Sequence, residues 1–272
     1  ATVQANLDYD DEPTAVEKIR MAFGVTSIVT ALYAASPLSE GRPNGYRSFR
    51  AAVWLEMDED RCGLLPFAFH EEFGFRHYAE WALDVPMFFV VRDGVYHPVG
   101  GMPFRRFMQE GWNGHRATLD DWELHLSTVF PEVRLKQHIE VRGADAVPMP
   151  MACALAALWR GLLDDRRACA EAWEMVRTAT MNEREELRRA VPRAGLQTRF
   201  LGKPLPDLAA QLCKIAADGL SRLPGGATDA VLLEPLHERA ARKRSPADDM
   251  LDDYQAVNGD PEKLVALWQV KA

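Results

Sequence analysis

The segment from His138 to Arg142 has the most informative spacing of chemically active residues in the chain. On a β-strand, positions two apart point to the same face, so Glu140 and Arg142 would lie side by side while Ile139 and Val141 face the core. A carboxylate oxygen is a ligand that Mg²⁺ prefers, and the planar fork of donors on an arginine suits phosphate. The pair therefore predicts part of a site for a metal–nucleotide complex. A salt bridge on the solvent-exposed face of a sheet would explain the same pattern.

A strand with a polar face is also predicted at the start of the chain. Residues 3–8 alternate apolar and polar side chains, which places Gln4, Asn6 and Asp8 on one face. Side-chain amides can ligate a metal or hold a substrate carboxylate, although an edge strand with one wet face has the same pattern. The chain opens directly on this strand, without an initiator methionine or a signal sequence. We therefore expect it to be the C-terminal part of a longer protein.

Two further residues are candidates for binding a small molecule. Arg50 follows a loop of glycine, proline and asparagine at residues 41–45; it could clamp a carboxylate with two hydrogen bonds or simply be a surface residue. Trp54 could form the wall of a pocket or belong to the core. The chain contains no P-loop, GxGxxG or GxSxG motif, so any phosphate would be bound by side chains and metal rather than by a glycine-rich loop.

Composition and charge exclude several classes of protein. The chain has 272 residues, of which 47 % are hydrophobic, and a formal net charge of −8. The negative charge argues against non-specific nucleic-acid binding, and no apolar run reaches the roughly 18 residues that a membrane span needs. The four cysteines are scattered without metal-binding spacing, which indicates a reducing compartment and predicts a cytoplasmic protein. The oligomeric state is left open.

The order of the predicted elements indicates an α+β fold, with strands in the first half and helices in the second. Strands are predicted at residues 3–8, 88–92, 95–97 and 134–142, and an arm or strand at 46–56. Helices are predicted at 16–35, 71–83, 103–109, 119–128, 151–163, 166–178, 182–190, 205–222, 228–243 and 262–270. We therefore expect a sheet-containing part at 1–148 and a helical part at 149–272 packed on the same domain.

Several segments, in order along the chain, resemble glutamate–cysteine ligase of the plant and proteobacterial type. The resembling segments are residues 2–8, 36–45, 54, 58–61, 73–75, 82–87, 121–123, 130–136 and 139–145. Together they cover nearly the whole chain. The resemblance implies a glutamine-synthetase-like catalytic fold, in which an antiparallel sheet forms the floor of the active site. It also implies that the family's N-terminal portion, which supplies most of the metal-binding glutamates, is absent here.

The resemblance assigns roles to the residues on the two predicted strands. Glu140 would hold Mg²⁺, and Arg142 would contact the phosphates of ATP. Gln4 would lie at the metal–nucleotide site and contact both the metal and ATP. Asn6, beside it, is expected to contact substrate.

The remaining two candidates belong to the substrate pocket. By the same resemblance, Arg50 would clamp the glutamate substrate and Trp54 would form a wall. The implied reaction uses ATP to phosphorylate the γ-carboxylate of glutamate; the cysteine amine then attacks the acyl phosphate and gives γ-glutamylcysteine, in the first step of glutathione biosynthesis. Such a reaction needs cations around the phosphoryl group rather than a protein nucleophile. A related ligase with another acceptor amine, or a non-catalytic fragment or binding module, remains as an alternative.

Overall fold

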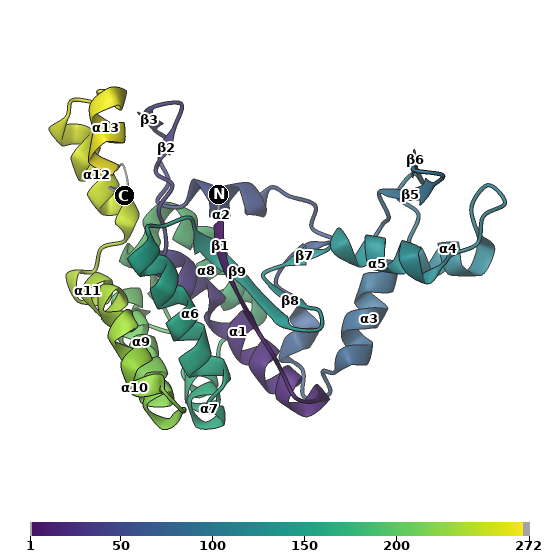
Figure 1. Cartoon of the computed structure of the whole chain (residues 1–272), viewed down its shortest axis with the longest axis horizontal. Coiled ribbons are helices and arrows are strands. Elements are labelled where there is room, and N and C mark those ends of the chain that lie inside the picture. Colours follow the sequence, from purple (N-terminus) through teal and green to yellow (C-terminus); the bar gives the residue numbers. More distant parts are fainter. Residues whose placement is uncertain (1, 269–272) are drawn as a thin grey trace.

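The largest sheet of the protein has three antiparallel strands, and the strand with Glu140 and Arg142 is its middle one. The computed structural model describes residues 2–268 (Figure 1). In spatial order the strands are β1 (Thr2–Leu7), β9 (Ile139–Asp145) and β8 (Val133–Leu135). Ile139 and Val141 are buried in the main core, as the alternation predicts. A mixed α+β fold is confirmed.

The prediction of one strand over residues 134–142 is wrong. β8 and β9 are joined by a tight turn, in which the amide N–H of Lys136 donates to the carbonyl oxygen of His138 at 2.8 Å. Three consecutive polar residues at 136–138 interrupt the alternation of the strand, which is where the chain reverses. Because β8 folds back on β9, Arg134 lies directly opposite Glu140.

A β-bulge lies beside Arg142 in the middle strand. The register with β1 shifts by one residue between Val3 and Ala5, so that Arg142 and Gly143 both lie opposite Gln4. A bulge increases the local twist and changes the direction of the neighbouring side chains. The bulge therefore contributes to how the Arg142 side chain leaves the sheet.

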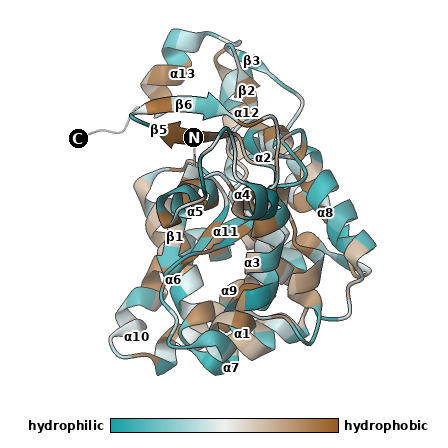
Figure 2. Ribbon diagram, turned by 90° about the vertical axis from the view of Figure 1, so that its right-hand side faces the viewer, coloured by the Kyte–Doolittle hydropathy of each residue, from teal (hydrophilic) through white to brown (hydrophobic). Residues whose placement is uncertain are grey.

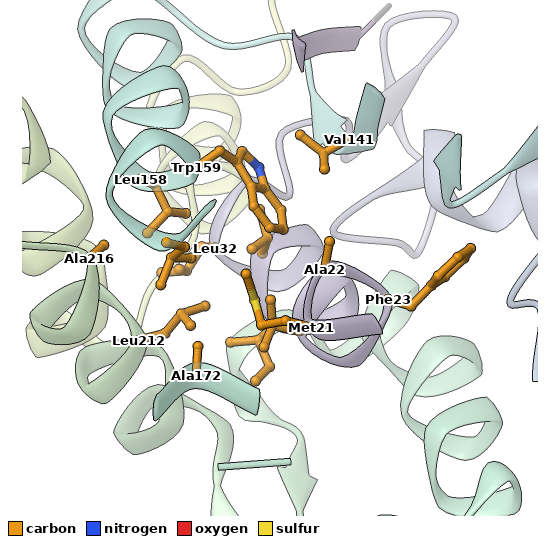
Figure 3. Packing of buried hydrophobic residues seen from close by; sticks show 14 of the residues in the cluster. Met21, Ala22, Phe23, Leu32, Val141, Leu158, Trp159, Ala172, Leu212 and Ala216 are labelled. Carbon is orange, nitrogen blue, oxygen red and sulfur yellow. The ribbon is translucent and has the colours of Figure 1, made fainter. Parts of the chain in front are cut away.

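Helix α1 (Glu12–Leu32) is the central element of the core, and every residue from Met21 to Leu32 in it is buried. Figure 3 shows α1 side chains packed among those of β9 and the C-terminal helices. The sheet can approach α1 closely because residue 143 is glycine: a Cβ there would lie 2.8 Å from the hydroxyl oxygens of Thr26 and Thr30. A larger residue at position 143 would push β9, and with it Glu140 and Arg142, away from helix α1.

The second half of the chain is helical, as predicted. Its helices are α6 (Met149–Leu163), α7 (Arg166–Glu174), α8 (Met181–Ala194), α9 (Leu205–Arg222), α10 (Gly226–Asp229), α11 (Glu234–Arg242), α12 (Pro246–Ala256) and α13 (Pro261–Trp268). The predicted single helix at 228–243 is wrong, because α10, a 3₁₀ turn and α11 replace it. Helix α12 was not predicted, although Ser245 and Asp248 form a capping box at its start. Residues 269 and 270 of the predicted last helix lie outside the described residues.

Helices α6 and α9 cross with their backbones in close contact. A Cβ at Gly161 would lie 2.2 Å from the carbonyl oxygen of Ala216, and a Cβ at Gly219 would lie 2.1 Å from the carbonyl oxygen of Gly161. Backbone atoms cannot move aside as the end of a side chain can, so the crossing depends on these two glycines.

Replacing Gly161 by alanine is therefore expected to lower the free energy of unfolding by about 1–3 kcal/mol, although alanine is the better helix former. Calorimetry should show Tm falling by roughly 2–10 °C. The exposed Gln211→Ala on α9 is the control and should shift Tm by less than about 2 °C. An unchanged or higher Tm in Gly161→Ala would contradict the close crossing.

Residues 75–127 form an arm that projects from the helical body (Figure 1). Its elements are α3 (Phe75–Asp84), β5 (Phe89–Arg92), β6 (Val95–Pro98), α4 (Phe104–Glu110) and α5 (Leu119–Ser127). They enclose a second, smaller core of Met87, Val90, Val99, Phe104 and Phe107. In Figure 2 the strand β5 of this arm is strongly hydrophobic. The predicted hairpin and the two predicted short helices of this region are confirmed.

The prediction of an arm or strand at residues 46–56 is wrong, because Phe49–Leu55 form a helix, α2. Ser48 is its N-cap, and its side-chain oxygen accepts a hydrogen bond from the amide of Ala51 at 3.1 Å. Arg50 and Trp54 are four residues apart on this helix, so they share one face. A helix, rather than a strand, therefore determines the direction in which the side chains of Arg50 and Trp54 point.

The remaining elements are short. They are the strands β2 (Leu38–Ser39), β3 (Arg42–Pro43), β4 (Cys62–Gly63), β7 (Phe130–Pro131), β10 (Arg199–Phe200) and β11 (Lys203–Pro204), and the 3₁₀ turns η1 (Pro66–Phe69), η2 (Gly195–Gln197) and η3 (Ala230–Leu233). The parallel pair β4–β7 brings Gly63 beside Pro131. Within residues 2–268, no helix has the length and apolar character that crossing a membrane requires.

Candidate active site

Glu140 lies among three basic side chains on the polar face of the sheet. Arg142, two residues along the same strand, forms an ion pair with Oε1 of Glu140. The Nζ of Lys136 lies 3.0 Å from Oε2, and the Nη1 of Arg134 lies 3.7 Å from Oε1. The predicted juxtaposition of Glu140 and Arg142 is thus present, and the sequence analysis missed the other two cations.

The surroundings of Glu140 keep its carboxylate charged. Burial raises the pKa of Glu140, but hydrogen bonds from Lys136 and Arg142 outweigh burial and hold that pKa below its usual range. Both oxygens of the carboxylate already contact cations. Among residues 2–268, no group of three or more His, Cys, Asp or Glu side chains is placed to hold a metal ion. These residues therefore do not form a complete Mg²⁺ site.

The two candidates on β1 lie on the same face but do not join the ion-pair network. Asn6 is directly opposite Glu140, and Gln4 lies opposite the bulge that contains Arg142. Both side chains are exposed. Neither hydrogen-bonds another residue of the described chain, so their amides are available to a ligand.

The guanidinium of Arg142 lies between two aromatic rings. Its Cζ is 5.4 Å from the centroid of Trp54 and 5.3 Å from that of Phe130, and the two rings are 5.8 Å apart at a tilted angle. Cation–π contacts of this kind hold an arginine in place without using its hydrogen-bond donors. Trp54 therefore lies against Arg142 as part of a wall that Phe130 completes.

Arg50 reaches the same place from helix α2. Its Nη2 donates a hydrogen bond to the backbone carbonyl oxygen of Arg142. Burial lowers the pKa of Arg50, and the negative charges of Asp145 and Glu132 oppose this effect. The structure thus brings Arg50 and Trp54, which are four residues apart on α2, together with Arg142, which is far from them in sequence. A cleft between them is lined by Arg50, Trp54, Gly63, Phe130, Pro131, Glu132 and Arg142.

Asp145, which the sequence analysis assigned no role, connects the end of β9 to the helix with Arg50. It is only 1 % exposed and accepts hydrogen bonds from the amide of Ala35 at 2.9 Å and from the hydroxyls of Ser36 at 2.6 Å and Ser48 at 2.7 Å. The Ser36 hydroxyl oxygen in turn accepts from the amide of Arg50 at 3.1 Å. The signal in the sequence that could have identified Asp145 is its position as a charged residue at the end of a buried strand.

Arg188 and Glu132 are two further charged residues that the sequence analysis missed. They lie behind Trp54, where a small hollow opens between α1, α2 and α8. Arg188 comes from the helical half, and no local pattern distinguishes it from the other arginines of α8. Only the packing of α8 against α2 reveals its position.

Comparison with known proteins decides the family. The family described as Glutamate-cysteine ligase family 2 (GCS2) matches residues 1–266. The chain belongs to this family. This match confirms the resemblance to glutamate–cysteine ligase that the sequence segments indicated.

Curated relatives of this family member are plant proteins named glutamate–cysteine ligase, chloroplastic. Those of Nicotiana tabacum and Arabidopsis thaliana are 43 % and 42 % identical to it over 261 residues, and ligase B of Oryza sativa subsp. japonica is 42 % identical over 257 residues. The alignments cover 95 %, 95 % and 93 % of this chain but 50 %, 50 % and 51 % of the relatives. The chain spans about half the length of the curated relatives that it matches.

The prediction of a cytoplasmic protein is wrong by this comparison, because the matched relatives are named chloroplastic. The prediction rested on four scattered cysteines, all of which are unpaired in the structure. Free cysteines are compatible with any reducing compartment. Cysteine usage therefore could not single out the cytoplasm.

Proposed function

We propose that this chain carries part of the active site of a glutamate–cysteine ligase, which joins the γ-carboxylate of glutamate to the amine of cysteine at the expense of ATP. The observation that carries the proposal is the contact between Arg50 and the backbone of Arg142. Both residues line one cleft, and guanidinium groups suit carboxylates and phosphates, which supports the proposal. Membership of the family supports the same reaction.

The two arginines have distinct parts in the proposal. Arg50 holds the glutamate substrate, with Trp54 as the wall that orients it. Arg142, held by Glu140 and by the rings of Trp54 and Phe130, faces the transferring phosphoryl group of ATP and stabilises the charge that develops there. The amine of cysteine then attacks the γ-glutamyl phosphate and phosphate leaves. No nucleophile from the protein is needed.

The remaining candidates on the sheet complete the proposed ligand contacts. Gln4 contacts ATP and the metal, and Asn6 contacts the glutamate substrate. Glu140 and the Gln4 amide are proposed as two ligands of Mg²⁺, but one carboxylate and one amide fill only part of its octahedral shell. We therefore assign no step of the reaction to the metal.

We also propose that the fold is glutamine-synthetase-like. An antiparallel sheet whose polar face presents Arg134, Glu140 and Arg142 supports an active-site floor of that kind. The division into a sheet-containing part at 1–148 and a helical part at 149–272 is likewise a proposal. The main core, which contains residues of both parts, supports their packing as one domain.

The test is ADP release by the protein expressed from its complete reading frame, with Mg²⁺, ATP and glutamate, in the presence and absence of cysteine. Release that depends on cysteine, with γ-glutamylcysteine as the product, is the expected result. If ADP release depends on a different amine, that amine rather than cysteine is the acceptor substrate. A folded protein that releases no ADP would contradict the proposal and leave a binding module.

A further inference from the structure

Helices α12 and α13 lie outside the hydrophobic cores, although α12 reaches the segment that begins helix α2. Among the described residues of these two helices, only Pro246, Ala247 and Leu264 are buried, and none of them belongs to either core cluster. Figure 1 shows the two helices, in yellow, at the periphery of the molecule beyond α11. Their attachment to the rest of the chain therefore depends mainly on polar contacts.

Ion pairs make much of this attachment, and one of them differs from the rest. The side chain of Asp249 in α12 pairs with three arginines in or next to α11, which are Arg239, Arg242 and Arg244. These pairs connect α12 only to the helix before it in the chain. Asp248, in contrast, pairs with Arg47, which is 201 residues away in sequence and directly precedes the N-cap of α2.

The two carboxylate oxygens of Asp248 have separate partners. Oδ2 accepts hydrogen bonds from the amide and the hydroxyl of Ser245, both at 2.9 Å, and so completes the capping box that begins α12. Oδ1 accepts from Nε of Arg47 at 2.6 Å. The stem of the Arg47 side chain passes Gly195, where a Cβ would lie 3.3 Å from its Cγ. The side chains of Asp248 and Arg47 are 13 % and 32 % exposed, so solvent screens this pair less than a fully exposed one.

The backbone of Arg47 belongs to the structure that begins α2. Its amide and that of Ser48, the N-cap, both donate to the carbonyl oxygen of Pro192 in α8, at 2.7 Å and 3.0 Å. Its carbonyl oxygen accepts from the amide of Ser36 at 3.1 Å. A residue held through both its backbone and its side chain fixes where the helix starts, and Arg50 follows in the first turn of that helix.

We infer that Asp248, acting through Arg47, is a positioning residue for helix α2 and hence for the guanidinium of Arg50. Neither Asp248 nor Arg47 lines the cleft beside Arg142, so they act on a ligand in that cleft only through the placement of α2. The consequence for glutamate rests on the proposed function, in which Arg50 holds that substrate. Helix α12 thereby contributes to substrate affinity from outside the cleft.

The test compares Asp248→Asn with the unsubstituted protein, both expressed from the complete reading frame. Asparagine keeps one oxygen for the capping box but presents an N–H group to Arg47, so the ion pair is lost while the cap of α12 remains. Amide hydrogen exchange, followed by mass spectrometry, should become at least about threefold faster at residues 47–51, because the start of α2 opens more often.

Binding and stability should respond differently to the same change. In calorimetric titration the Kd of glutamate should rise about two- to thirtyfold, the range that coupling through a network of contacts produces, while the Kd of ATP stays within about twofold. The Tm should fall by less than about 4 °C, because only one partly exposed ion pair is lost.

Asp252→Asn is the matched control, because Asp252 lies on the same helix and its ion pair within residues 2–268 is with Arg244. It should leave the exchange at residues 47–51 and both Kd values unchanged. A double-mutant cycle identifies the partner of Asp248. Arg47→Gln combined with Asp248→Asn should weaken glutamate binding no more than the stronger of the two single changes.

The possible outcomes separate this role from the proposed reaction. If Asp248→Asn leaves the exchange at residues 47–51 unchanged, or if the effects of the two changes add, the inferred role of Asp248 is wrong. It is also wrong if Tm falls and the binding of glutamate and ATP weakens equally, since a merely structural residue gives that pattern. Faster exchange with unchanged glutamate affinity would support the positioning of α2 but overturn the proposed contact between Arg50 and glutamate.

Discussion

Replacing Arg142 by alanine is expected to reduce kcat for cysteine-dependent ADP release about a hundredfold or more, in the protein expressed from its complete reading frame. The guanidinium of Arg142 is fixed before the reaction by Glu140 and by the rings of Trp54 and Phe130. A cation held in position in this way stabilises charge on the phosphoryl group at no cost of reorganisation, and losing one such group costs about 10²–10³ in kcat.

The fold should tolerate this change at Arg142. Glu140 keeps its contacts with Lys136 and Arg134, so no isolated buried charge remains. Arg50 donates to the backbone of residue 142 rather than to its side chain, so Arg50, the proposed clamp for glutamate, also keeps its hydrogen-bond partner. Calorimetry should therefore show only a small change in Tm, whereas steady-state kinetics should show the large loss of kcat.

Two control variants isolate the role of the Arg142 side chain. Arg142→Lys retains the charge but loses the planar fork, and it should recover part of the lost kcat. Arg189→Ala removes an exposed arginine of α8 and should leave kcat unchanged. If a folded Arg142→Ala protein keeps a kcat within about threefold of that of the unsubstituted protein, the proposal that Arg142 contacts the phosphoryl group is contradicted.

Replacing Asp145 by alanine is expected to lower the free energy of unfolding by about 3–5 kcal/mol, the largest stability effect that we predict. The change removes a buried carboxylate that accepts three hydrogen bonds, from Ala35, Ser36 and Ser48. It leaves these donors without their acceptor, the Ser48 hydroxyl in a fully buried position and the other two in partly buried ones, and each unsatisfied buried group costs about 1–3 kcal/mol. Denaturant unfolding measures the loss.

The same variant should also weaken glutamate binding, because Ser36 and Ser48 position the helix that carries Arg50. Asp121→Ala is a matched control: Asp121 is another buried aspartate, 4 % exposed and paired with Arg92 within the arm. It should lower stability without changing the Kd of glutamate. An Asp145→Ala protein with unchanged stability and unchanged glutamate affinity would show that Asp145 does not hold this helix.

Short-range patterns were sufficient to predict most of the helices and the alternation of β9. The run of apolar residues in α1 and the repeated helical spacing after residue 148 depend on neighbours within one turn, and the structure confirms them. The errors at residues 46–56 and 134–142 have a common cause. In both places the structure depends on a cap or turn, at Ser48 and at residues 136–138, and a few polar residues outweighed the apolar pattern.

The sequence alone was enough to place Glu140 and Arg142 side by side, because their spacing on one strand dictates it. The motifs resembling glutamate–cysteine ligase likewise lie in the sequence itself. Only the tertiary structure decided that Arg50 meets the backbone of Arg142 and that Arg188 reaches the hollow behind Trp54. These contacts join segments whose mutual placement depends on packing around α1, and no local spacing encodes the direction in which α2 and α8 cross it.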